Sequence, residues 1–181
     1  MRRFVLFIIL GVLFASVGEY CFSVIIRHDL PGFLDAMVLN LIYLALVYFA
    51  GLFIQWACRG KAVSHLVYYL FFGFLGLMIE WFVIGNSPWQ NPSASQIGMF
   101  AYWTTTVMAG RILTDTSPRL ACLQKLMLAF FIPYALLGIV GGYLLPTPEV
   151  KFVVLVWLVI FGYVFLNIFH IWYIVHKFKS A

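Results

Sequence analysis

Long runs of apolar residues, broken by short polar segments, set the pattern of this 181-residue chain. A membrane-spanning helix needs about 20 consecutive, mostly apolar residues. Six stretches approach or meet that length, and we predict a transmembrane helix in each of them: residues 4–26, 37–58, 66–84, 97–113, 123–145 and 152–174. The pattern therefore predicts an all-α polytopic membrane protein. We expect residues 1–181 to form a single six-helix transmembrane domain, with no soluble domain between the helices.

The fourth stretch is the shortest and the most polar of the six. It contains Tyr102 and three consecutive threonines at 104–106, and Arg111 lies near its end. A helix with so many polar groups is poorly suited to lipid on all sides, so we expect it in the interior of the bundle. The alternative is that the threonine hydroxyls only bond to the backbone of their own helix.

Composition excludes a soluble protein. Hydrophobic residues make up 65% of the chain and charged residues 9%, with a mean hydropathy of +1.04. Soluble domains average roughly 45–50% apolar and about 25% charged residues. The net charge of +5 forms no basic face, so we expect the lipid bilayer as a partner and no nucleic acid.

The positions of the basic residues predict the orientation. Nine of them fall on one side if both chain ends are cytoplasmic, and only Arg27 and Lys151 fall on the other. Short cytoplasmic loops of membrane proteins carry such an excess of lysine and arginine. The short loops and the lack of a glycosylation sequon, since Pro92 disqualifies the one at Asn91, favour a bacterial inner membrane.

Two glutamates, Glu19 and Glu80, lie inside the first and third apolar stretches. A charged side chain in hydrocarbon is costly, so such residues usually face the bundle interior and serve function. Both lie on helices that run in the same direction, roughly 6–11 Å inside the outer membrane surface at about 1.5 Å per residue. Desolvation and mutual repulsion favour a neutral or proton-sharing pair over two anions. We therefore predict a proton- or cation-binding site around them.

Other polar residues are placed to complete that site. The predicted neighbours are Asn86 and Gln96 in the outer connection between the third and fourth stretches, and Tyr102 and Thr105 in the fourth. The two carboxylates with His28 could also hold a metal ion, but we predict no metal site.

The odd-numbered stretches share a pattern of a small residue, three further residues, a key position and an aromatic residue. The key positions are Glu19, Glu80 and Gly142. Three tandem helical hairpins would produce this spacing. Hairpins of even size would produce it without any repeat.

Histidines and cysteines offer little further chemistry. His65 and His170 lie toward the cytoplasmic side and could together ligate haem, although their spacing is not diagnostic and we predict no cofactor. The cysteines at 21, 58 and 122 are widely separated and form no metal or redox motif, so we expect free apolar thiols.

The sequence leaves three functions open. The first is a small transporter or carrier with an outward-facing site around the glutamates, coupled to protons or cations. The second is a non-catalytic subunit or assembly factor that binds other membrane protein subunits. The third is an enzyme that acts on a lipid or isoprenoid, with one glutamate as general acid or base. No hydrolase, metalloprotease or nucleotide-binding motif occurs, so we favour a protein that is not an enzyme.

Overall fold

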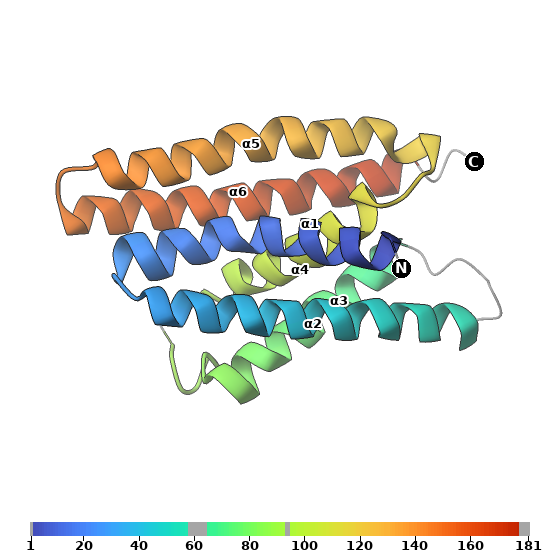
Figure 1. The fold of residues 1–181 in the computed structure, drawn as a ribbon, viewed down its shortest axis with the longest axis horizontal. Helices are drawn as coiled ribbons and strands as arrows, with labels where there is room; N and C mark the ends of the chain where they lie inside the picture. Colours follow the sequence, from blue (N-terminus) through green and yellow to red (C-terminus); the bar gives the residue numbers. More distant parts are fainter. Residues whose placement is uncertain (1, 58–64, 93–94, 178–181) are drawn as a thin grey trace.

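The computed structural model describes residues 2–57, 65–92 and 95–177, which form a bundle of six α-helices (Figure 1). Two of the helices continue as π-helical segments, in which each turn holds one residue more than an α-turn. A short 3₁₀-helix precedes α5. In chain order the elements are α1 (Arg2–Glu19), η1 (Tyr20–Ile26), α2 (Leu30–Ala57), α3 (His65–Ile79), η2 (Glu80–Ile84), α4 (Gln96–Leu113), η3 (Pro118–Leu120), α5 (Ala121–Leu144) and α6 (Pro148–Lys177).

Five of these helical stretches are long and apolar enough to cross a membrane, each with a mean hydropathy of at least 1.9 over an 18-residue window. The chain is therefore an integral membrane protein by helix length and hydropathy. The remaining helix, α4, does not meet the criteria for a membrane-spanning helix. Six helices were predicted and six are found among the described residues. The start of α1 and the end of α6 lie at the same end of the bundle (Figure 1), while the side of the membrane that they face remains a prediction.

Two helices begin at least four residues earlier than the apolar pattern predicts. The second starts at Leu30 rather than at 37, and the sixth starts at Pro148 rather than at 152. Both early starts have a proline in the first turn, Pro31 in α2 and Pro148 in α6. Proline is well tolerated in the first turn of a helix, where its missing N–H has no intrahelical partner to lose.

The interior position predicted for α4 is confirmed. Ten of its 18 residues are buried, including Trp103 and all three threonines, and the helix packs against α1, α3 and α6. Its threonines bond both to the backbone of their own helix and to a neighbouring helix. Thr106 bonds only to the backbone of α4, whereas Thr104 also donates to Asn167 on α6.

Glycines allow α1 and α4 to approach closely. A Cβ atom at Gly110 would lie 2.7 Å from the carbonyl oxygen of Phe7, and one at Gly11 would lie 3.1 Å from that of Thr106. Backbone atoms cannot make way as a flexible side chain can. Small residues at such contacts are the usual means by which membrane helices associate.

The structure also bears on the predictions for the cysteines and for Gly142. Cys21 is buried and Cys122 exposed, and both are free thiols, whereas Cys58 lies outside the described residues. Gly142, the third key position, packs between Ile25 and Leu155 and contributes no polar group. The third position of the possible repeat is therefore a packing site.

Candidate carboxylate site of the bundle

Both glutamates lie where an α-helix changes to a π-helix. Glu19 is the last residue of α1, and Glu80 is the first residue of η2. π-Helical segments are rare and are found often at functional sites, because the extra residue turns the following side chains relative to the rest of the helix. Two stretches with similar sequence thus carry the same uncommon backbone feature beside an acidic residue.

The chain folds back over Glu80 directly after η2. Gly85 ends the segment with a φ of +86°, a left-handed conformation that glycine adopts without strain. The next residue, Asn86, then donates its backbone N–H to the carbonyl oxygen of Glu80 over 2.8 Å. This turn places the Asn86 side chain beside the Glu80 carboxyl.

Each oxygen of Glu80 accepts one hydrogen bond from nitrogen. The side-chain amide of Asn86 donates to Oε2 over 2.8 Å, and the indole Nε1 of Trp103 donates to Oε1 over 3.0 Å. Glu80 is only 8% exposed. Both partners are N–H donors, so the arrangement suits a carboxylate that acts purely as an acceptor.

A glycine on α3 allows Trp103 to reach this position. A Cβ atom at Gly76 would lie 2.4 Å from Cγ of the Trp103 ring, so any side chain there would displace the indole. Gly76 is the small residue four positions before Glu80. Gly76 therefore leaves room for the indole that donates to the Glu80 carboxylate, and it also allows close helix packing.

Glu19 has hydroxyl groups nearby instead. Its half-buried carboxyl lies near the hydroxyls of Tyr102 and Ser23, and Arg27 is close enough for its charge to act on it. Asn40 on α2 donates to the hydroxyl oxygen of Tyr102 over 2.7 Å. Because the tyrosine oxygen is the acceptor in that bond, the tyrosine proton is not used by it. Hydroxyl groups both donate and accept, so they match either protonation state of a carboxyl.

Consecutive residues of α4 connect the two carboxyls. Tyr102 lies near Glu19, Trp103 donates to Glu80, and the two rings meet edge to face with centroids 5.3 Å apart. Glu19 and Glu80 are close enough for their charges to interact. Two neighbouring aromatic residues of α4 are therefore associated with the two acids.

The remaining predicted neighbours divide between two groups. Gln96 belongs to the first, because its amide nitrogen donates to the backbone oxygen of Asn86 over 3.2 Å and its oxygen accepts from Trp81 over 2.6 Å. Thr105 belongs to the second. Its hydroxyl accepts from Asn167 over 2.9 Å, on the side of α4 that faces α6.

Asn167 is the centre of that second group. Its amide nitrogen also donates to the carbonyl oxygen of Ala101 over 2.8 Å, and its oxygen accepts from Thr104 over 2.8 Å and from Tyr69. Asn167 thus joins α6 to α3 and α4. It is a structural connection rather than part of the glutamate pair.

Metal and haem ligands are not assembled by the described side chains. No three histidine, cysteine or acidic residues among them lie close enough to share a metal ion. His28 is exposed and has a φ of +56° at the turn after η1. His170 is fully buried on α6 and neither ring nitrogen has a partner among the described residues, while the side chain of His65 lies outside them.

Two residues of the site, Asn40 and Trp103, were not predicted from the sequence. Asn40 is 2% exposed, and its amide oxygen has no hydrogen-bond partner in the described structure. A lone asparagine within a long apolar stretch was the available signal. Trp103 gave no signal, because tryptophan is common in this chain and its direction depends on Gly76.

No protein-family model, curated protein or solved structure matches this chain. Its function is therefore inferred from the chemistry of its own residues. Within the described part of the chain, the paired glutamates are the most informative group for that purpose.

Proposed function

We propose that this protein is a small membrane transporter or carrier in which Glu19 and Glu80 bind a proton or a small cation. The observation that carries this proposal is the buried Glu80 carboxyl, bonded to Asn86 and Trp103, with Glu19 near enough for the two charges to interact. Two adjacent negative charges out of water are strongly unfavourable. One bound proton or cation offsets one of the charges. Binding and release of that proton or cation therefore change the net charge of the pair.

The partners of the two acids support different roles. Glu80 is held by two N–H donors and acts as the fixed anion of the pair. Glu19 is the exchanging group in this proposal, since hydroxyls such as those of Tyr102 and Ser23 nearby can accommodate either protonation state. The unpartnered amide oxygen of Asn40, beside Tyr102, offers one further acceptor for a cation or for a water that accompanies it.

The segment at Asn86 controls access in this proposal. Its side chain bonds to Glu80 and its backbone oxygen to Gln96, which together cover the carboxyl. Entry from that end of the bundle requires these two bonds to open. Movement of this segment is thus the step that exposes the site, as gating segments do in other membrane carriers.

Replacing either glutamate with glutamine is expected to abolish transport. The protein would be reconstituted into liposomes that contain a pH-sensitive dye, and a gradient of Na⁺ or K⁺ would be applied. We expect a cation-dependent pH change with the unmodified protein and none with Glu19→Gln or Glu80→Gln, because glutamine cannot exchange a proton or supply a charge.

Glu149→Gln is the matched control, since Glu149 is an exposed acid at the start of α6. It should retain full transport. Transport that persists in both glutamine variants at the pair would contradict the proposal. Stable co-purification of those variants with larger membrane proteins would then favour the subunit alternative, and conversion of an added lipid would favour the enzyme.

A further inference from the structure

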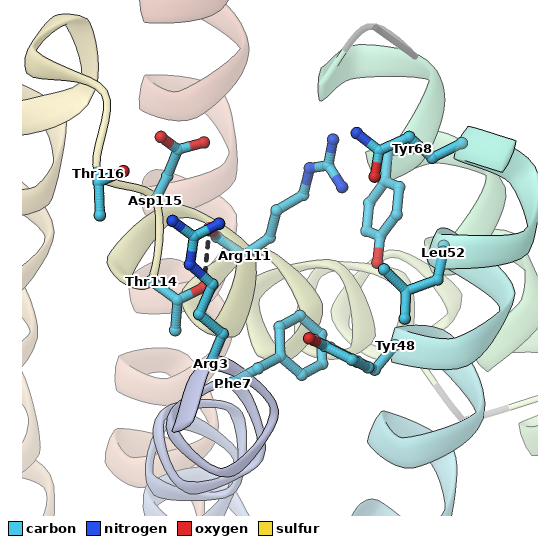
Figure 2. A pocket seen from close by; sticks show the side chains of 11 residues that line it. Arg3, Phe7, Tyr48, Leu52, Tyr68, Arg111, Thr114, Asp115 and Thr116 are labelled. Atoms are coloured by element: carbon cyan, nitrogen blue, oxygen red, sulfur yellow. Dashed lines mark hydrogen bonds between the residues drawn. The ribbon is translucent and has the colours of Figure 1, made fainter. Parts of the chain in front are cut away.

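A second polar region lies at the opposite end of the bundle from Asn86. Four helices and the turn after α4 line an open cavity of about 230 Å³ there. Figure 2 shows Arg3 from α1 and Arg111 from α4 extending into the same space, with Tyr48 from α2 and Tyr68 from α3 beside them. At about 30 Å³ for each water molecule in the liquid, a space of this size holds several waters or one small polar group.

Arg111 is oriented by an aromatic ring. Its guanidinium carbon lies 3.8 Å from the centroid of the Tyr68 ring, and Tyr68 is only 4% exposed. This contact holds the guanidinium against a buried ring. A planar, fixed guanidinium presents parallel N–H groups that match the oxygens of a phosphate.

The residues that line the cavity carry an excess of positive charge. Arg3 and Arg111 face a single acid among them, Asp115. One oxygen of Asp115 already accepts the backbone N–H of Ser117 over 2.7 Å, in the turn before η3. The cavity therefore favours an anion. Arg3 is exposed, so the anion has a route in from solvent or from the membrane surface.

We propose that this cavity binds a phosphate group, with Arg3 and Arg111 as its ligands. The same chemistry is offered by the headgroup of an anionic phospholipid and by a soluble phosphate. The charge bias of the sequence predicts that this end faces the cytoplasm, where basic pockets between membrane helices bind anionic headgroups. The site is independent of the glutamate pair and of its proposed transport.

Arginine variants test the site in detergent solution. Binding of dioctanoyl phosphatidylglycerol, dioctanoyl phosphatidylcholine and inorganic phosphate would be followed by native mass spectrometry and by the shift in melting temperature. We expect phosphatidylglycerol to bind and inorganic phosphate to compete with it. Arg3→Gln and Arg111→Gln should each weaken binding about tenfold or more, as for the loss of a charge-assisted hydrogen bond. Arg111→Lys should weaken it less, because it keeps the charge but loses the planar fork.

Arg2→Gln is the matched control, because Arg2 adjoins Arg3 on α1 and does not line the cavity. Its replacement makes the same change in net charge. It should bind as the unmodified protein does. Binding of inorganic phosphate alone, with the same loss in Arg3→Gln, would assign the site to a soluble phosphate. The proposal is overturned if no probe binds the unmodified protein, or if Arg3→Gln and Arg111→Gln bind as tightly as Arg2→Gln. Arg3→Gln keeps the test valid even if Arg111→Gln fails to fold, since Arg3 is exposed.

Discussion

Replacement of Gly110 by valine is expected to lower the free energy of unfolding by about 3 kcal/mol, the upper part of the range for overpacked sites. The first added carbon would already lie 2.7 Å from the backbone oxygen of Phe7. Relief requires α1 and α4 to separate as whole helices, since this neighbour is backbone. The measurement is unfolding by sodium dodecyl sulfate in mixed micelles, followed by circular dichroism.

Gly141→Val provides the matched control on α5. A Cβ atom at Gly141 would meet nothing within 4 Å, so this variant reports the effect of valine in a helix without a steric clash. Its stability should stay close to that of the unmodified protein. Equal stability of the two variants would mean that α1 and α4 do not approach as closely as described.

Replacement of Asn167 by leucine is expected to cost about 2–3 kcal/mol, given that a hydrogen bond between membrane helices contributes about 0.6 kcal/mol on average and up to about 1.7. The change removes bonds to Ala101, Thr104, Thr105 and Tyr69 together. It also leaves buried hydroxyls on α3 and α4 without their partner. The same detergent titration measures the loss.

His170→Leu should behave in the opposite way, although His170 lies less than one helical turn from Asn167 and is equally hidden. Neither ring nitrogen has a hydrogen-bond partner in the described structure, so leucine removes an uncompensated polar group. We expect stability to be unchanged or to rise by about 1–2 kcal/mol. A strong loss instead would show that the imidazole holds a partner, for which haem was the sequence-based candidate.

Helix positions and the interior place of α4 could be predicted because they follow from composition. Twenty apolar residues favour a membrane-spanning helix wherever they occur, and a run of threonines favours an interior one. The neighbouring position of Glu19 and Glu80 was predicted from their equal depth on helices of the same direction. Their charges are close enough to interact, and a binding site that they share stays a prediction.

Side-chain direction on an interior helix could not be predicted in the same way. Tyr102 and Thr105 were expected to share the glutamate site, yet Tyr102 lies near Glu19 whereas Thr105 bonds to Asn167 on α6. A helix surrounded by others has no lipid-facing side to fix its rotation. Only contacts with specific neighbours decide which residue meets which, as Gly76 does for Trp103.

The burial of α4 also bears on how the protein is made. A helix that lacks the apolar character of the other five gains little from entering lipid by itself. Its neighbours α1 and α3 leave the ribosome before it and can shelter its polar groups during synthesis. Asn167 lies on α6, which is synthesised last. Its bonds to Thr104 and Thr105 therefore form only after the other helices have been made.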